Sequence, residues 1–213
     1  MRIIHFDDQI LVIDKPAGIP VLAEGWDRNA PYLVNIVEKD LGKIWVVHRL
    51  DKTTSGVMVF ARDAESHRAL SMQFENHEAE KIYHAILEGN PKWDEKVAKH
   101  PLRVNVGHKH RTMVDDRFGK TSETRFRILR RSRAYSWVQA RPMTGRTHQV
   151  RVHAYALGHP LAGDVLYGSS ETELIKRPAL HAYSLTITHP ATNERLTFIA
   201  KHPQDFATAL KSL

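Results

Sequence analysis

Short runs rich in Ile, Val and aromatic residues recur along the whole sequence, and turn residues separate them. The first two, IIHF and ILVID, occupy residues 3–6 and 10–14 and flank the acidic pair Asp7 and Asp8. Runs of this length and composition predict β-strands. Six further runs of the same kind follow: VMVFA (57–61), KIYHAILEG (81–89), TRFRIL (124–129), YSWVQA (135–140), SLTIT (184–188) and RLTFIA (195–200).

Apolar residues at helical spacing predict helices over residues 32–41, 63–77, 148–157 and 205–213. The basic stretch that follows residue 89 and runs through Lys120 shows neither pattern, and we expect it to be rich in loops. The mixture predicts an α+β fold, with a long mixed, largely antiparallel sheet and flanking helices. We expect residues 1–213 to form a single domain.

The composition excludes several kinds of chemistry. The chain of 213 residues contains no Cys, so thiol nucleophiles, disulfides and zinc sites built on thiolates are ruled out. No apolar run reaches the length of a membrane span, and the first residues do not resemble a signal peptide. We therefore expect a soluble, cytoplasmic protein that does not bind membranes.

The positive charge is concentrated in one segment. The net charge is +7 and the pI about 9.7, which favours a polyanionic partner such as nucleic acid. Residues 99–133 contain eleven Lys or Arg but only three acidic residues, Asp115, Asp116 and Glu123. We expect this segment to follow a nucleic-acid backbone, although a solvated basic surface without a partner has the same composition.

The stretch VVHRLDKTTSG, residues 46–56, passes from apolar residues into a dense group of polar ones. A strand end followed by a turn explains most such clusters, and Asp51 taken alone fits that explanation. The alternative is a loop that presents one reactive carboxylate. A metal site is not expected, because the fourteen His residues form no H-E-x-x-H motif and GHKH has no carboxylate at ligand spacing.

Seven motifs in a fixed order decide between these interpretations. They are KPAG (15–18), HRLDKTTSG (48–56), KIYHA (81–85), GKTSET (119–124), GRTHQVRVH (145–153), GDVLYG (163–168) and LHAYSLTITHP (180–190). Together they resemble the RluA-type family of RNA pseudouridine synthases. The resemblance implies an isomerase that detaches uracil from its ribose, turns the base and rejoins it through carbon 5. It also implies the family's fold, in which sheet and helices surround a central cleft.

The resemblance assigns three catalytic positions. Asp51 matches the catalytic carboxylate, Arg146 its ion-pair partner and Tyr83 the aromatic residue that stacks on the flipped base. A guanidinium favours the ionised carboxylate and fixes the direction of its oxygens, while Tyr offers a flat apolar face and a hydroxyl. The residue types leave open whether Asp51 attacks the sugar, adds to the uracil ring or helps to remove a sugar proton.

Two further groups of residues complete the predicted site. The first shapes the loop or packs beneath the base: His48, Leu50, Thr54, Ser55, Gly56 and Leu180. The second is expected to contact RNA: Arg49, Lys81, Lys109, Arg111, Arg125 and Arg127. The chain departs from the family pattern at Ser122, where Ala is usual, and we expect no N-terminal domain of the S4 type.

The resulting hypothesis is a monomeric synthase that acts on structured rRNA or tRNA without cofactor or metal. A catalytically silent RNA-binding or RNA-remodelling protein with the same cleft is the first alternative, because a fold does not guarantee activity. A metal-dependent nuclease that uses the His residues is the second.

Overall fold

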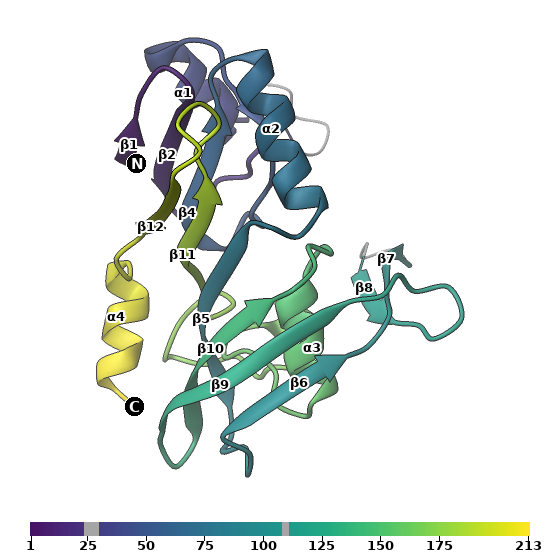
Figure 1. Ribbon diagram of the computed structural model, residues 1–213. Coiled ribbons are helices and arrows are strands. Elements are labelled where there is room, and N and C mark those ends of the chain that lie inside the picture. Colours follow the sequence, from purple (N-terminus) through teal and green to yellow (C-terminus); the bar gives the residue numbers. More distant parts are fainter. Residues whose placement is uncertain (24–29, 108–110) are drawn as a thin grey trace. The chain divides into compact units, whose positions relative to one another are not determined.

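The computed structural model describes residues 1–23, 30–107 and 111–213, which divide into two compact units (Figure 1). Unit 1 comprises Met1–Glu80 and Ala182–Lys201, and unit 2 comprises Lys81–His181 and His202–Leu213. Each unit combines helices with antiparallel strand pairs. The predicted mixture of helices with a largely antiparallel sheet is therefore confirmed.

Unit 1 is built on strands that follow the order β1, β2, β4, β11, with β3 paired to β4 and β12 paired to β11. Its two central strands are buried on both faces: every residue of β4 is buried, and so are five of the six in β2. Asp63 caps α2 by accepting a hydrogen bond from the backbone N–H of Ser66. The elements are β1 (Arg2–Phe6), β2 (Ile10–Lys15), α1 (Leu33–Leu41), β3 (Trp45–Val46), β4 (Ser55–Ala61), α2 (Ala64–Glu75), β11 (Leu180–Thr188) and β12 (Arg195–Ile199).

Unit 2 contains an antiparallel sheet in the order β5, β10, β9, β6, together with a separate hairpin of β7 and β8. Figure 1 shows α3 against β6, β9 and β10. The elements are β5 (Glu80–Glu88), β6 (Glu95–Lys99), β7 (Leu102–Val106), β8 (Arg111–Val114), β9 (Glu123–Arg131), β10 (Tyr135–Pro142), α3 (Gln149–Ala156), the 3-10 helix η1 (Val165–Tyr167) and α4 (Gln204–Lys211).

Alternation along β5 gives the sheet of unit 2 an apolar core on each face. Ala85 and Leu87 join one cluster with Val150 and Ala154 of α3. Ile86, which points to the opposite face, joins a second cluster with residues of α4 such as Phe206. The sheet therefore lies between α3 and α4, and each helix covers one set of alternate side chains.

The prediction that the stretch from residue 90 to Lys120 is rich in loops is wrong, because this stretch contains β6, β7 and β8. In β6 only Ala98 is buried, so the strand lacks the apolar alternation by which sequence reveals strands. It is held instead by backbone pairing to β9, a tertiary interaction that outweighs its composition. The turn expected at TTSG is also shorter than predicted, because β4 already begins at Ser55.

Candidate active site

Asp51 lies in the loop between β3 and β4 of unit 1, where it is half-buried. The backbone N–H of Thr54 donates to the carbonyl oxygen of Asp51 at 3.0 Å, which closes a tight turn directly after the carboxylate. Leu50, the apolar residue within the polar run, is buried and anchors the loop on its other side. The backbone on both sides of Asp51 is therefore fixed by local structure.

Lys15, at the end of β2, secures this loop from the inside. Its side chain is completely buried, and the three N–H groups of its ammonium are shared among four backbone carbonyl oxygens: those of Thr54 (2.9 Å), Pro16 (3.0 Å), Asp51 (3.3 Å) and Lys52 (3.3 Å). A buried charge is tolerated only when polar groups replace the lost water, and these carbonyls do so. Lys15 is the first residue of the KPAG motif, but its function as the support of the loop could not be predicted from the sequence.

His48 and Gly56 hold the two ends of the same loop. Nε2 of His48 accepts a hydrogen bond from the backbone N–H of Val59 at 3.1 Å, and its ring stacks on Phe74 with the ring centroids 4.4 Å apart. Gly56 has a φ of +121°, and a Cβ atom there would lie 2.1 Å from the carbonyl oxygen of Ala182. Only glycine fits this close approach of two backbones. Both predicted residues therefore shape the loop structurally.

Thr54 and Ser55 are buried at the start of β4. Among the described residues, the hydroxyl oxygen of Thr54 has no hydrogen-bond partner. A buried polar atom without a partner is uncommon in native proteins. This hydroxyl belongs to the loop that carries Asp51, three residues after the carboxylate.

In unit 2, Lys81 and Tyr83 project from the same face of β5. Tyr83 is half-buried and packs against the cluster that contains Val150 and Leu180, so the structure brings these two predicted residues, Tyr83 and Leu180, together. Nζ of Lys81 donates to the carbonyl oxygen of Thr144 at 3.3 Å. Burial lowers the pKa of Lys81, because it removes water from the charged form.

Arg146 lies in the loop before α3, and Gln149 at the first turn of the helix positions its backbone. Oε1 of Gln149 accepts hydrogen bonds from the N–H of Arg146 (3.0 Å) and from the hydroxyl of Thr144 (2.6 Å). Among the described residues, Nε of Arg146 is buried without a hydrogen-bond partner. The loop is thus fixed while one donor of the guanidinium stays unused.

The other end of the Gln149 amide begins a chain of hydrogen bonds into the core of unit 2. Nε2 of Gln149 donates to the hydroxyl of Thr124 (3.0 Å), which lies 2.9 Å from Nδ1 of His153. Nε2 of His153 lies 3.0 Å from the hydroxyl of Ser122, which donates to the carbonyl oxygen of His100 at 2.6 Å. Because Ser122 uses its proton on this carbonyl, the hydrogen of the contact between Ser122 and His153 belongs to Nε2 of the imidazole ring.

Burial lowers the pKa of His153 to about 4, in spite of its hydrogen bond to the carbonyl of His100. The ring is therefore neutral at ordinary pH, and its one proton lies on Nε2, where it is donated to Ser122. Ser122, which stands where the family pattern has Ala, supplies one link of this chain of hydrogen bonds. In the sequence Ser122 is visible only as a departure from the family pattern, because its partners lie 22 and 31 residues away.

The GDVLYG motif is held by a buried ion pair. Nε and Nη2 of Arg151 donate to the two carboxylate oxygens of Asp164 at 2.7 and 2.8 Å. The hydroxyl of Tyr167 accepts the backbone N–H of Thr112 (2.9 Å) and lies 2.8 Å from Nδ1 of His148. These contacts join α3, η1 and β8, which explains why the motif carries charged and aromatic residues as well as turn glycines.

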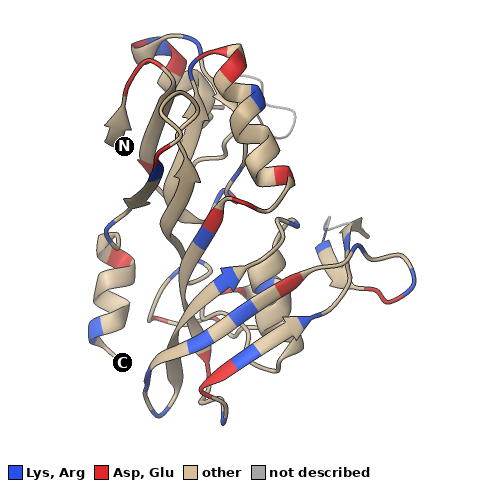
Figure 2. Ribbon diagram, in the orientation of Figure 1, with Lys and Arg blue, Asp and Glu red and all other residues tan. Residues whose placement is uncertain are grey.

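Two of the predicted RNA contacts, Arg125 and Arg127, lie on the face of the unit 2 sheet opposite to Tyr83. In the strand register Tyr83 is opposite Ala140, and Ala140 is opposite Phe126, so all three share one face of the sheet. Arg125 and Arg127, the neighbours of Phe126, therefore point to the other face of the sheet. Figure 2 shows the basic residues of β9 as blue bands along the strand. Any RNA contact that Arg125 and Arg127 make lies on the face of this sheet opposite to Tyr83.

Arg125 and Arg127 have local partners: Glu123 at 2.8 Å and Gln139 at 3.2 Å, respectively. Arg49 and Arg111 are exposed. Lys109 lies outside the described residues. The function of these side chains in RNA binding stays a prediction.

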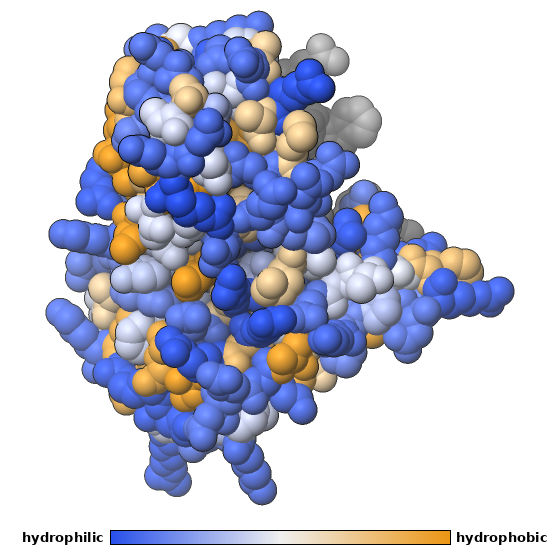
Figure 3. All heavy atoms as spheres, viewed as in Figure 1, coloured by the Kyte–Doolittle hydropathy of each residue, from blue (hydrophilic) through white to orange (hydrophobic). Residues whose placement is uncertain are grey.

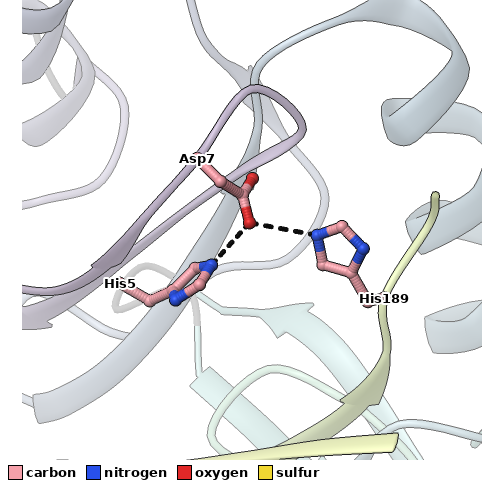
Figure 4. Close-up of side chains that lie close together, drawn as sticks. All are labelled: His5, Asp7 and His189. Atoms are coloured by element: carbon pink, nitrogen blue, oxygen red, sulfur yellow. Dashed lines mark hydrogen bonds and ion pairs between the residues drawn. The ribbon is translucent and has the colours of Figure 1, made fainter. Parts of the chain in front are cut away.

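One group in the described part of the chain has the composition of a metal site: His5, Asp7 and His189 of unit 1 (Figure 4). Oδ2 of Asp7 lies 2.5 Å from Nε2 of His5 and 3.1 Å from Nε2 of His189. Nδ1 of His189 accepts the backbone N–H groups of Ala191 and Thr192, so its Nε2 carries the proton that Asp7 accepts.

Asp7 also accepts the N–H groups of Gln9 and Ile10 through Oδ1. Burial opposes its ionisation, but the hydrogen bonds from His5, Ile10, Gln9 and His189 outweigh that effect and lower the pKa of Asp7 to about 2. The protonated His189 nitrogen cannot at the same time bind a metal ion. The group therefore fits a hydrogen-bonded clamp between the first turn of the chain and the loop before β12.

The family model and the relatives similar in sequence are all RNA pseudouridine synthases. The family model for RNA pseudouridylate synthases matches residues 9–156. The chain is 42% identical to an uncharacterised RNA pseudouridine synthase of Zymomonas mobilis, covering 87% of both proteins. It is 36% identical to the dual-specificity RNA pseudouridine synthase RluA of Escherichia coli, covering 96% of this chain and 93% of the relative.

A solved structure agrees with the sequence relatives. The fold matches that of human RNA pseudouridylate synthase domain containing 4 with a TM-score of 0.80 and 25% identity, over 99% of this chain and 92% of the other. In the described residues no helix has the length and apolar character needed to span a membrane. The chain belongs to the RluA-type RNA pseudouridine synthases, isomerases that form pseudouridine in RNA.

Proposed function

We propose that this protein converts uridine to pseudouridine in a structured rRNA or tRNA, with Asp51 as the catalytic carboxylate. Arg146 acts as its ion-pair partner, and Tyr83 stacks on the flipped uracil. The observation that carries the proposal is the loop of unit 1, in which a fully buried Lys15 donates to the carbonyl of Asp51 and of its neighbours. Such a loop keeps the backbone of Asp51, and with it the base of the carboxylate side chain, in a fixed place.

The demands of the reaction support this assignment. A uridine inside a folded RNA must leave its stack before its glycosidic bond can be reached, which costs a few kcal/mol unless protein groups replace the lost contacts. Tyr83 offers one face of an aromatic ring for this replacement, because its other side packs on the core of unit 2. Its hydroxyl is a candidate for moving the proton that leaves carbon 5.

Arg146 suits a site that must hold an anionic group. Its backbone is fixed by Gln149, and its Nε donor is buried without a partner among the described residues. A guanidinium stays charged throughout the pH range of the reaction, so it stabilises an ionised carboxylate without taking a proton itself. The proposed reaction needs neither cofactor nor metal ion.

Exposed basic residues are proposed as the RNA-binding surface. Arg49 adjoins Asp51 in the sequence, and Arg111, Arg125 and Arg127 lie in the basic segment of unit 2. Such contacts position a nucleic acid through its phosphates and make affinity fall as salt rises. We further propose that residues 1–213 act as one domain, as a monomer and in the cytoplasm.

The experiment that tests the proposal is a transcriptome-wide map of pseudouridine by carbodiimide labelling. Cells that lack the gene are compared with the same cells complemented by wild type or by Asp51→Asn. Sites that disappear on deletion and return only with wild type establish both the reaction and the RNA. Sites restored equally well by Asp51→Asn would contradict the assignment of the carboxylate and favour a protein whose RNA binding alone matters.

A further inference from the structure

Phe118 is the most exposed large hydrophobic residue of the described chain, with 61% of its surface accessible. It lies in the turn that follows the hairpin of β7 and β8 in unit 2. Figure 3 shows the outer end of this region, at the right of the view, with apolar and strongly hydrophilic side chains next to one another. A single exposed apolar residue needs no explanation, but the surroundings of this ring are unusual.

Two guanidinium groups lie close to the ring of Phe118. Cζ of Arg117 lies 5.0 Å from the ring centroid of Phe118, and Cζ of Arg103, on β7, lies 5.3 Å from it. Both distances fall within the range of a cation–π interaction. Nη1 of Arg103 also donates to Oδ2 of Asp115 at 3.4 Å, which holds this guanidinium near the ring.

The turn that carries Phe118 is fixed by hydrogen bonds to Asp115, the residue at its start. Oδ1 of Asp115 accepts the N–H groups of Arg117 (3.0 Å) and Phe118 (2.9 Å), and the N–H of Gly119 donates to the carbonyl of Asp115 at 2.8 Å. A Cβ atom on Gly119 would lie 2.3 Å from that carbonyl oxygen, so glycine is required for this close packing. The ring is therefore presented to solvent on a rigid support.

We infer that Phe118, with Arg103 and Arg117, forms a stacking site for an unpaired nucleobase of the bound RNA; this inference rests on the proposed function. An exposed aromatic face beside cations is the combination with which proteins bind single-stranded RNA, because every base offers a π-face and every nucleotide a phosphate. A paired base has both faces covered by its neighbours and cannot stack there. The site therefore distinguishes an unpaired loop from a helix.

The test measures the binding of a fluorescein-labelled, mixed-sequence single-stranded RNA of about ten nucleotides, a length within the usual site size, and of a duplex with the same sequence. Loss of one base–aromatic stack weakens binding by about tenfold. We expect Phe118→Ala to weaken single-stranded RNA binding by about that factor and duplex binding by less than about twofold. Phe118→Trp is expected to bind single-stranded RNA at least as tightly as wild type.

Met113→Ala is the matched control, because Met113 is also exposed, at 45%, and lies on β8 of the same hairpin. It is expected to bind both RNAs as wild type does. Salt titration separates stacking from charge: Phe118→Ala should keep the wild-type slope, whereas Arg117→Gln should reduce the slope by about one. Thermal melting checks that each variant is folded.

The inference is overturned if Phe118→Ala binds single-stranded RNA within twofold of wild type, if it loses duplex binding equally, or if wild type does not bind single-stranded RNA. Pseudouridine formation by wild type on rRNA and tRNA transcripts is measured in parallel. Wild type that forms pseudouridine while Phe118→Ala binds normally refutes only the stacking site. Wild type that binds through Phe118 but modifies no RNA refutes only the proposed function.

Discussion

The buried ammonium group of Lys15 donates to the backbone carbonyl oxygen of Asp51, 36 residues further along the chain, at 3.3 Å. It donates as well to the carbonyls of Lys52 and Thr54, so the loop that presents the carboxylate is built around one charged side chain. The arrangement separates two tasks. Lys15 fixes the backbone of the loop, and the chemistry is proposed for the side chain of Asp51.

Replacing Lys15 with Met should destabilise unit 1 and disorder this loop. The substitution keeps the length of the side chain but leaves several buried carbonyl oxygens without a donor, and one such group costs about 1–3 kcal/mol. We expect the free energy of unfolding to fall by about 3 kcal/mol in urea denaturation. Lys52→Met, at an exposed position, is the control and should change it by less than about 0.5 kcal/mol. Equal stability of the two variants would contradict the proposed function of Lys15.

The contributions of the ring and of the hydroxyl of Tyr83 should be separable: the ring serves RNA binding and the hydroxyl serves turnover. Tyr83→Phe keeps the stacking face, so we expect RNA affinity to remain within about twofold while the turnover rate falls by at least about a hundredfold, the lower range for loss of acid–base catalysis. Tyr83→Leu should weaken binding as well. Tyr155→Phe, on the exposed side of α3, serves as control. Full activity of Tyr83→Phe would exclude proton transfer by the hydroxyl.

Gln149 should support the reaction by holding the backbone of Arg146 in place. Gln149→Met removes the acceptor of the Arg146 N–H and of the Thr144 hydroxyl. Because small displacements of a catalytic group cost up to about a hundredfold in rate, we expect kcat to fall by about ten- to a hundredfold with KM nearly unchanged. Gln204→Met, in α4, is the matched control. A change in KM alone would show that Gln149 serves RNA binding instead.

Protein stability should decrease as pH falls from about 6.5 to 4, partly because of His153. Its pKa is about 4 in the folded protein, whereas the ordinary value is 6.5, so the unfolded chain binds the proton first. Between pH 7 and pH 5 this difference costs about 1–2 kcal/mol. Urea denaturation at the two pH values should show a smaller loss for His153→Gln than for wild type. The same loss in both proteins would contradict a buried neutral His153.

Sequence alone predicted the elements whose signal is local. β9 and β10 alternate between buried and exposed residues, so the hairpin and the opposite orientation of Arg125 and Phe126 could be predicted from spacing. β6 could not, because its residues are mostly exposed and its pairing with β9 is set by tertiary structure. Local patterns identify strands that bury one face but not edge strands that bury little.

The site divides in the same way. The motif series identified Asp51, Tyr83 and Arg146 as candidates, but it did not reveal Lys15 as the support of the loop, because its acceptors lie up to 39 residues away. Spacing likewise did not show that Arg125 and Tyr83 belong to opposite faces, since that relation depends on the register through β10. A sequence shows which side chains can take part in chemistry, whereas contacts between residues distant along the chain can be identified only from the fold.

The most direct test of the central claim is release of tritium from carbon 5 of uridine in an RNA transcript incubated with purified protein. Wild type and the control Asp40→Asn, which removes an exposed carboxylate of α1, should release tritium at equal rates. Asp51→Asn should release none while it keeps the melting temperature and RNA affinity of wild type. Release by Asp51→Asn at a rate near that of wild type would contradict the assignment of Asp51 as the catalytic carboxylate.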